Sequence, residues 1–547
     1  MSAFVYDYPH ETGGDPVICK PNQYDIFMNT TKAPWALALF LTLTGSINAQ
    51  DSQLWEDFKS NTQKGETAEL PDFSYAGYHH GEKAIPHVDH KIFKVTDFGA
   101  IANDGQSDKE AIRHTIAAAE KNGSGIIFFP KGRFLVNEDS DDDKPIVIKG
   151  PNIVFRGSGA GTDGTELYMK KYLPAKNPSQ LWTTPYLFQF TGGGREEVLA
   201  DIIDHAPRGS KTLNVSNSAN IKSGDWIVVR VQNNAPDLIE SEMCGCHVDA
   251  SWTSIINKGV YVNAYHQVEK VKGRMVTLKE PLMREINKKH HWQVLSYAHF
   301  EEVGVEHIAF VGNWHEDFVH HKDAVHDGGY SALKFSRLAN SWIRHCRFTD
   351  VNCAVSMSLS ANVSILNCQV TGTPGHSSIS SGASTRILVG NVHDSSSQWH
   401  APGVTGPSIG SVFWRVKYNE DTSFESHASQ PRATLFDCVE GGFFIGRGGG
   451  ARQNLPNHME HLVLWNYKEL GDAETDFEFW SSKTWFWKII PPYVIGFHGA
   501  GTTFKEDQIK VLESLGTPVN PESLYEAQLK LRLGKLPQWL TDIKNNL

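Results

Sequence analysis

Histidine, arginine and acidic side chains gather between short apolar segments in residues 321–432. His376 ends the segment Thr-Gly-Thr-Pro-Gly-His, and His400 ends Ser-Ser-Gln-Trp-His, each just before a segment of strand character. Glu425 and His427 follow one spacing later. Imidazoles can exchange protons near neutral pH. These residue types and this spacing therefore suit proton transfer on a bound substrate.

β-Elimination on an acidic sugar polymer is one reaction that this set could carry out. β-Elimination removes the proton beside a uronate carboxylate and expels the glycosidic oxygen, so it needs a base, a proton donor and a group that neutralises the carboxylate. We expect His376 or His400 as the base, with Lys322 as the leading substitute. Arg432 is expected to clamp the carboxylate, because a guanidinium offers two parallel hydrogen bonds.

The other assignments concern substrate contacts. His427, oriented by Glu425, is expected to be a donor or a second clamp. The remaining expected contacts come from the same region: His321, His326, Asp327, Glu425, Arg447 and Arg452. No residue is assigned to a metal. Ca²⁺ stays open as a cofactor, because the spacing does not show whether a cation or an arginine neutralises the substrate.

Two other functions fit the same residues. Glycoside hydrolysis needs two carboxyl groups roughly 5 to 9.5 Å apart, and the candidates are Asp327, Asp350, Asp394 and Glu425. A non-catalytic carbohydrate-binding protein would use aromatic rings as sugar platforms, and the candidates are Trp314, Trp342, Trp399 and Trp414. Aromatics at such positions more often pack in a core or at a rim, which weakens the second alternative.

A short repeat predicts how these residues come together. Arg344, Leu366 and Leu388 lie 22 residues apart, and apolar segments with period-two alternation recur every 22 to 25 residues. A repeat of this length predicts a solenoid of parallel strands. Its coils stack at about 4.8 Å, so residues one period apart become neighbours. We therefore expect His376 to lie beside His400.

The segment 95–136 predicts the closed end of the solenoid. Residues 110–121 form an expected helix, with Ser107 or Asp108 as its cap and Ile112, Ile116 and Ala119 on one face. A glycine-rich turn then leads into an all-apolar strand, residues 126–129. Such a helix would cover the core that the first coil otherwise exposes.

Residues 95–136, with 153–159 and 164–167, resemble the opening of the pectate-lyase-like superfamily of right-handed parallel β-helix proteins. The resemblance covers roughly 70 residues. It implies the fold but no single activity, because the same opening serves lyases, hydrolases, epimerases and phage tailspikes. Five short motifs, 321–323, 326–329, 424–427, 430–432 and 496–499, resemble secreted bacterial β-helix polysaccharide lyases of uncharacterised type, which supply no established catalytic residue.

The expected fold class is all-β, a right-handed parallel β-helix with an N-terminal capping helix, a small antiparallel β insertion and a C-terminal helical brace. The chain has 547 residues, which a solenoid accommodates because it grows along one axis. The expected segments are a leader (1–27) that a start at Met28 would exclude, a signal peptide (28–49), an N-terminal arm (50–93), the capping helix with the first coils (94–207), the insertion (208–290), the main β-helix with the site (291–500) and a C-terminal helical extension (501–547).

Composition and one apolar segment predict the compartment and partners. Residues 28–49 have a basic start, a short apolar core and a small-residue end, the layout of a secretory signal. We expect a secreted or periplasmic protein, a monomer without a transmembrane segment, that binds an acidic polysaccharide. The net charge of -11 with scattered Lys and Arg argues against nucleic acid.

Cysteine spacing predicts no disulfide framework. The chain has seven Cys, too few and too scattered for one. Cys346 and Cys368 fall in register, which favours small core residues over a bridge. The segment Cys244, Cys246 and His247 most simply has a structural role, with a metal or a disulfide as the alternatives.

Overall fold

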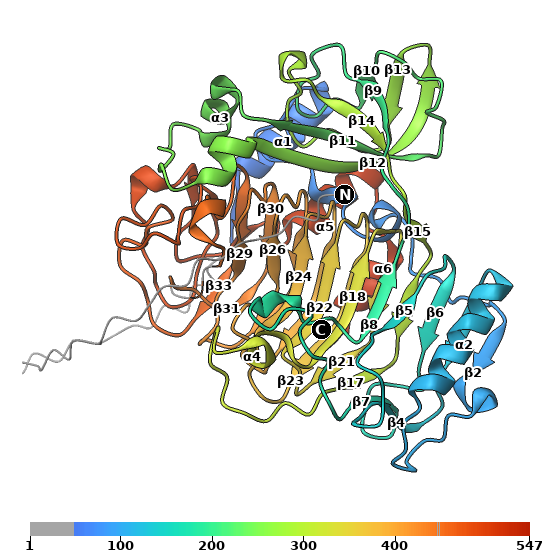
Figure 1. Cartoon of the computed structure of the whole chain (residues 1–547). Coiled ribbons are helices and arrows are strands. Elements are labelled where there is room, and N and C mark those ends of the chain that lie inside the picture. Colours follow the sequence, from blue (N-terminus) through green and yellow to red (C-terminus); the bar gives the residue numbers. More distant parts are fainter. Residues whose placement is uncertain (1–48, 446, 448, 547) are drawn as a thin grey trace, which may run out of the picture. The chain divides into compact units, whose positions relative to one another are not determined.

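The computed structural model describes residues 49–445, 447 and 449–546. The expected leader, and the expected signal peptide apart from Ala49, lie outside the described residues. Residues 50–547 form one compact unit. Its main body is a parallel β-helix whose coils run from the blue to the orange part of Figure 1.

One face of the β-helix is a parallel sheet of seven strands in the spatial order β29-β26-β24-β22-β18-β8-β5. Neighbouring strands belong to successive coils, and Figure 1 shows them side by side. The strands are β5 (Ile146–Ile148), β8 (Phe188–Thr191), β18 (Ser331–Ser336), β22 (Cys353–Ser358), β24 (Ser377–Gly382), β26 (Gly403–Thr405) and β29 (Glu425–His427).

Two further ladders of parallel strands complete the coils. They join into one 19-stranded sheet because β23 (Ser364–Thr371) and β25 (Leu388–Asp394) are long enough to take part in both. The first also contains β2 (Ile92–Lys94), β3 (Gly125–Phe128), β6 (Ile153–Arg156), β16 (Gly304–Glu306), β20 (Trp342–Arg344), β27 (Val412–Trp414), β30 (Thr434–Asp437), β32 (Leu462–Trp465), β34 (Tyr493–Ile495) and β35 (Val511–Glu513). The second also contains β4 (Gly132–Asn137), β7 (Thr165–Met169), β17 (Ala309–Val311), β21 (Arg347–Thr349), β28 (Lys417–Tyr418), β31 (Glu440–Gly442) and β33 (Lys468–Leu470). A short pair, β15 (Phe300–Glu301) and β19 (Leu338–Ala339), links two coils at a corner.

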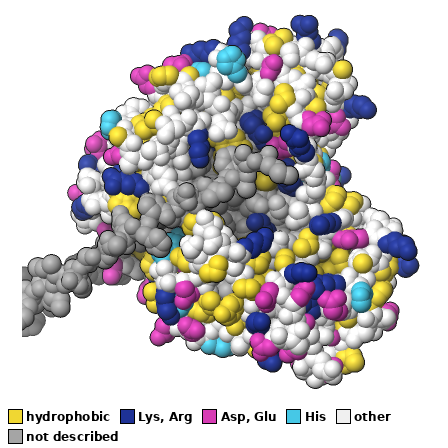
Figure 2. Space-filling model, viewed as in Figure 1, with side chains coloured by type: hydrophobic (Ala, Val, Ile, Leu, Met, Phe, Trp, Pro, Cys, Tyr) yellow, Lys and Arg dark blue, Asp and Glu magenta, His cyan; other side chains and the backbone are white. Residues whose placement is uncertain are grey.

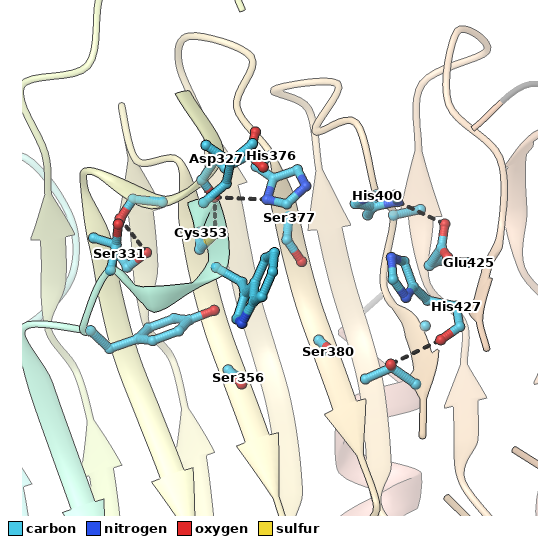
Figure 3. A pocket seen from close by; sticks show the side chains of 18 of the residues that line it. Asp327, Ser331, Cys353, Ser356, His376, Ser377, Ser380, His400, Glu425 and His427 are labelled. Atoms are coloured by element: carbon cyan, nitrogen blue, oxygen red, sulfur yellow. Dashed lines mark hydrogen bonds and ion pairs between the residues drawn. The ribbon is translucent and has the colours of Figure 1, made fainter. Parts of the chain in front are cut away.

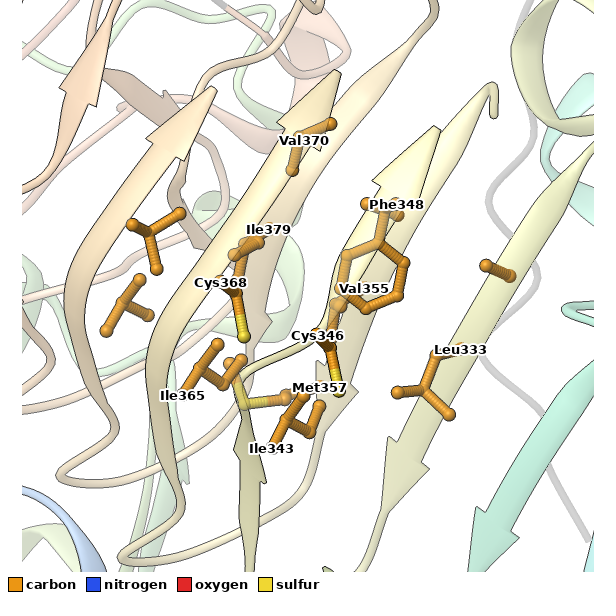
Figure 4. Packing of buried hydrophobic residues seen from close by; sticks show 14 of the residues in the cluster. Leu333, Ile343, Cys346, Phe348, Val355, Met357, Ile365, Cys368, Val370 and Ile379 are labelled. Carbon is orange, nitrogen blue, oxygen red and sulfur yellow. The ribbon is translucent and has the colours of Figure 1, made fainter. Parts of the chain in front are cut away.

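The core is a stack of like residues from successive coils (Figure 4). Ile343 pairs with Ile365, and Ile365 with Val389, all without exposed surface. Cys346 and Cys368 are buried and free, as predicted. Cys244 and Cys246 are also free thiols, so the disulfide alternative for that segment is wrong.

The register departs from the sequence prediction at one coil. Leu366 pairs with Gly390, 24 residues on, and not with Leu388, which pairs with Ser364. The difference arises in a turn, since Phe348 pairs with Val370 but Cys353 pairs with Ser377. The turn before β24 is therefore two residues longer than its counterpart in the preceding coil.

The capping helix is α2 (Lys109–Asn122), and its buried face includes Ile112, Ile116 and Ala119, as predicted. Asp108 precedes the helix but does not cap it with its side chain. Its carboxylate instead accepts the backbone N–H groups of Ile101 and Leu135, which ties the helix to the first coil.

The insertion is a six-stranded antiparallel sheet, broader than the expected 208–290. It contains β9 (Val198–Asp201), β10 (Thr212–Asn214), β11 (Trp226–Asn233), β12 (Val260–Lys272), β13 (Met275–Leu278) and β14 (Gln293–Ser296). Helix α3 (Pro236–Met243) connects β11 to β12. Buried polar contacts hold the insertion on the coils, since Arg386 donates to the backbone carbonyls of Tyr265 and Pro281.

The two ends of the described chain pack together. The N-terminal arm, for which the sequence analysis predicted no helix, contains helix α1 (Gln53–Lys64), whose N-cap Ser52 accepts the Trp55 N–H. Strand β1 (Gln50–Asp51) pairs with β36 (Val519–Asn520). The expected C-terminal helices are α5 (Leu524–Leu533) and α6 (Gln538–Lys544). No helix within the described residues is long and apolar enough to cross a lipid bilayer.

Candidate functional site

The candidate site is a pocket on the outer face of the seven-stranded sheet (Figure 3). On the face shown in Figure 2, Lys and Arg side chains are scattered among acidic and apolar ones. The pocket volume is about 210 Å³. That is below the roughly 300–1,000 Å³ of sites that enclose a drug-sized ligand, so this pocket would enclose only part of a longer ligand.

The floor is built from rows of residues that pair across the strands. One row runs Lys334, Ser356, Ser380, Gly403 and Glu425 over five successive strands. Most of these side chains are small or polar. Because adjacent strands lie about 4.8 Å apart, the row is roughly 19 Å long. It provides a polar track that crosses the strands.

A second row ends at a histidine. Ser336, Ser358, Gly382, Thr405 and His427 pair in the same way, one pleat further along the strands. The two rows together make a floor with little side-chain bulk at its centre and ionisable groups at one end. A flat polar polymer could lie across it.

Three predicted histidines meet at that end of the floor. The ring centroid of His400 lies 5.0 Å from that of His376 and 5.1 Å from that of His427. The predicted proximity of His376 and His400 is thus confirmed. Their alignment depends on the longer turn before β24, because His376 lies in that turn and precedes Ser377, which pairs with His400.

His400 forms a buried pair with Glu425. Its Nδ1 lies 2.9 Å from Glu425 Oε2. Glu425 was expected to orient His427, but in the structure it contacts His400. Burial raises the pKa of Glu425 to about 8 and lowers that of His400 to about 3. At neutral pH the carboxyl group can therefore donate to Nδ1, which leaves the His400 Nε2–H as a donor.

His376 presents the opposite tautomer. Its Nδ1 lies 2.7 Å from the backbone carbonyl of Asp327, which can only accept, so Nδ1 carries the hydrogen. Nε2 is then an unprotonated acceptor; it is buried and has no hydrogen-bond partner in the described structure. Burial lowers the pKa of His376 to about 3 and that of His427 to about 4, so both rings are neutral at neutral pH.

Helix α4 (Ala324–Gly328) forms one side of the pocket through Asp327 and Gly328. Asp323 caps this helix by accepting the N–H groups of Val325 and His326. Asp327 lines the pocket and accepts both the backbone N–H and the Nδ1–H of His321. The turn thus holds Asp327 and His321 rigidly.

Three predicted residues of this segment, His321, Lys322 and His326, lie outside the pocket lining. Lys322 Nζ lies 2.8 Å from His326 Nε2 and 3.7 Å from Glu316. His326 is buried, with its Nδ1 accepting the Val319 N–H. This placement does not support Lys322 as the base or His326 as a substrate contact; their side chains organise the loop.

The three predicted arginines are not brought together. Arg432 is buried and pairs with Glu242 of α3, which Arg284 also contacts. Its guanidinium fixes the insertion to the coils and does not line the pocket, so its placement does not support a clamp. Arg452 bonds to Ser251 at the surface.

Arg447 lies closer to the site than the other two arginines. Its guanidinium carbon is 4.9 Å from the centre of the Trp399 ring, and its NH1 donates to Thr422. Trp399 also stacks on His320, with ring centroids 4.7 Å apart. Of the four candidate sugar platforms, Trp314, Trp342 and Trp414 are buried, so only Trp399 has a partly exposed ring.

Sequence reasoning missed several residues that border the pocket. Lys334 was overlooked because it is a single lysine between core positions, although its offset of 22 from Ser356 placed it on the same row. Burial lowers its pKa, and no carboxylate pairs with it in the described structure. Tyr186 and Trp182, in the segment that overhangs the strands, also line the pocket and carried no repeat signal.

The four carboxylate candidates for glycoside hydrolysis do not all lie in the pocket. Asp394 is buried and bound to Ser396, and Asp350 accepts from Thr373. Among the described residues, only Asp327 and Glu425 supply carboxyl groups to the pocket lining.

The coils and the polar pocket define a β-helix protein of the pectate-lyase-like kind. Residues 92–177 match the family described as rhamnogalacturonase A/epimerase, pectate lyase-like, which confirms the resemblance seen in the sequence. Residues 397–543, which include His400, Glu425 and His427, match a domain of unknown function, DUF4955. The chain thus combines a pectate-lyase-like opening with a C-terminal part of a family without a described function.

One curated relative is alginate lyase 7 of Azotobacter vinelandii, 36% identical over 70 residues. The match covers 13% of this chain and only 8% of that protein's length.

Three solved structures are similar in fold. The tailspike gp49 of Pseudomonas phage LKA1 is 14% identical with a TM-score of 0.39, over 69% of this chain and 64% of that chain. The exopolygalacturonase of Thermotoga maritima is 11% identical with a TM-score of 0.29, over 77% and 89%. The tailspike Gp54 of Acinetobacter baumannii bacteriophage AP22, in complex with a capsular saccharide, is 10% identical with a TM-score of 0.27, over 72% and 76%.

A pair of arginine substitutions tests the structural role of Arg432. We expect Arg432→Ala to lower the free energy of unfolding by about 3 kcal/mol, because it leaves Glu242 buried beside one cation where there were two. Urea unfolding followed by tryptophan fluorescence measures the effect. Arg452→Ala, at an exposed arginine, is the control and should leave the unfolding curve unchanged. Equal stability of both variants would contradict the structural role.

Proposed function

We propose that this protein is a polysaccharide lyase that cleaves an acidic, uronate-containing polymer by β-elimination. The observation that carries the proposal is the His400–Glu425 pair with His427 beside it, at the end of a polar floor. The pair supplies a donor and the neighbouring neutral ring supplies an acceptor, which are the two proton-transfer groups that elimination requires.

The roles follow from the hydrogen bonds. His427, whose side chain makes no hydrogen bond to a carboxylate of the described residues, would take the proton from the carbon beside the uronate carboxylate. The His400 Nε2–H would protonate the leaving glycosidic oxygen while Glu425 returns a proton to Nδ1. His376 is given no proton-transfer role, because its free nitrogen lies close to ring nitrogens of His320 and His321.

Lys334 would bind the polymer away from the cleaved bond. It lies four strands from Glu425 on the same row, roughly 19 Å away, which is too far to touch the reacting sugar. A half-buried lysine with no carboxylate partner among the described residues is well suited to bind a carboxylate of a neighbouring sugar unit.

A glycoside hydrolase is the alternative, because Asp327 and Glu425 both line the pocket and burial raises the pKa of Glu425, as in a general acid. The lyase is favoured because His321 hydrogen bonds to both carboxylate oxygens of Asp327.

Incubation with a panel of uronate polymers distinguishes the lyase, the hydrolase and a non-catalytic binding protein. Ultraviolet absorbance from a new conjugated double bond identifies a lyase, new reducing ends without absorbance identify a hydrolase, and retention on the polymer without products identifies a binder.

Substitutions at the proton-transfer groups test the roles. We expect His400→Ala and His427→Ala each to lower kcat by about 10²–10⁴-fold, the usual contribution of general acid–base catalysis. Glu425→Gln should reduce kcat less, because the amide can still hydrogen bond to His400. His393→Ala, at an exposed histidine on another ladder, is the matched control. Full activity of both His400→Ala and His427→Ala would reject the assignment.

Lys334→Ala should raise KM at least tenfold and change kcat less, because a charge-assisted hydrogen bond away from the reacting sugar contributes to binding alone. Steady-state rates over a range of polymer concentrations measure both constants. Lys417→Ala, at an exposed lysine on a different ladder, is the control. An unchanged KM would remove Lys334 from the binding track.

We also propose that the protein acts outside the cytoplasm, on the basis of the signal-like layout of residues 28–49. A polysaccharide substrate of the proposed kind is met outside the cytoplasm. Amino-terminal sequencing of the exported protein tests this, with a start near Gln50 expected. An intact segment 28–49 in the exported protein, or no export, would contradict it.

A further inference from the structure

Three imidazoles meet beside the pocket in a way that the proton-transfer roles do not use. His320 and His321 come from the loop before α4, and His376 comes from the longer turn before β24. Each offers one ligand nitrogen, and the three nitrogens lie within 4.8 Å of one another. The ring centroids of His320 and His321 are 3.6 Å apart, and those of His320 and His376 are 5.4 Å apart.

Asp327 orients two of the three rings. Its carboxylate Oδ2 accepts the Nδ1–H of His321 at 2.7 Å, and its backbone carbonyl accepts the Nδ1–H of His376 at 2.7 Å. Both rings therefore direct their Nε2 atoms away from Asp327. An imidazole held through its other nitrogen by a carboxylate or a carbonyl is the usual arrangement around protein-bound metals.

His320 completes the set. Its ring lies flat on Trp399, at an interplanar angle of 14°, which fixes its orientation. Its Nε2 is buried and has no hydrogen-bond partner within the described residues, and the same is true of the His376 Nε2. Buried nitrogens without partners cost free energy, so their convergence from two segments calls for a ligand.

The chemistry of the cluster points to a cation. Three imidazole nitrogens converge from two segments, with no carboxylate oxygen among the three ligand atoms. Neutral imidazole is the form that ligates metals.

We propose that His320, His321 and His376 bind one divalent transition-metal ion of the Zn²⁺ class. Zn–N bonds of about 2.0–2.1 Å keep ligand atoms within roughly 4.2 Å of one another, so the cluster is at or close to coordination distances. The His321 side chain is 53% exposed, which leaves an open position toward solvent. An all-nitrogen set favours such an ion over Ca²⁺, which prefers oxygen ligands.

The role of the ion rests on the proposed lyase function, whereas its binding does not. The ring of His376 lies 5.0 Å from that of His400, so the ion would be next to the proton donor. When bound there, it would supply the positive charge that neutralises the carboxylate of the reacting sugar, the task first assigned to Arg432.

Zn²⁺ titration of the tag-free, chelator-dialysed protein tests the site, with isothermal calorimetry and metal analysis as readouts. We expect one equivalent to bind. His321→Ala and His376→Ala should each weaken binding at least tenfold, and Asp327→Asn by about 10–100-fold, because it disturbs the orientation of the ligands. His393→Ala is the matched control and should bind as the wild type does.

Co²⁺ absorption gives a second readout on the unmodified protein, so the test holds even if a variant fails to fold. Visible bands of a tetrahedral Co²⁺ centre at one equivalent support the site. Their absence, or Zn²⁺ binding that the triple variant of His320, His321 and His376 retains, would overturn it. No polysaccharide is present, so bound metal without lyase activity would reject only the proposed function, and lyase activity without bound metal would reject only this site.

Discussion

The lateral pairing of successive coils is the constraint on which the rest of this structure depends. Each coil must align its backbone with the next to satisfy its hydrogen bonds, so a residue in one coil has a fixed partner in the following coil. The same alignment stacks Ile343, Ile365 and Val389 inside and sets Ser356, Ser380 and Glu425 on a row outside. The pocket is therefore a direct product of the register.

The sequence predicted the coils, the capping helix and the meeting of His376 with His400, because each has a short-range or strictly repeating signal. It misplaced Leu388 because a shift of two residues leaves every strand residue on the same face, so hydrophobic alternation cannot detect it. Helix α1 was missed for a different reason. Its buried residues Leu54, Trp55 and Phe58 belong to a cluster with the insertion and the C-terminal helices, and not to the repeating core inside the coils.

The site was predictable only where the repeat controls it. Arg432 obeys the repeat, but its partner Glu242 belongs to the insertion, and nothing in the spacing of the coils indicates that contact. The same holds for Asp327, whose role depends on the irregular turn that brings its carbonyl to His376 and its carboxylate to His321. The choice between a lyase and a hydrolase thus depends on contacts made by residues outside the coils. The coils determine only where the site residues lie.

The turn before β24 shows what this architecture permits. Two additional residues are absorbed there while the strands on both sides keep their pairing and their buried faces. Turns at coil corners can thus change length while the strand pairing and the core stay the same. Grafting corners of other lengths onto these coils offers a route to new ligand selectivity that does not require redesign of the hydrophobic interior.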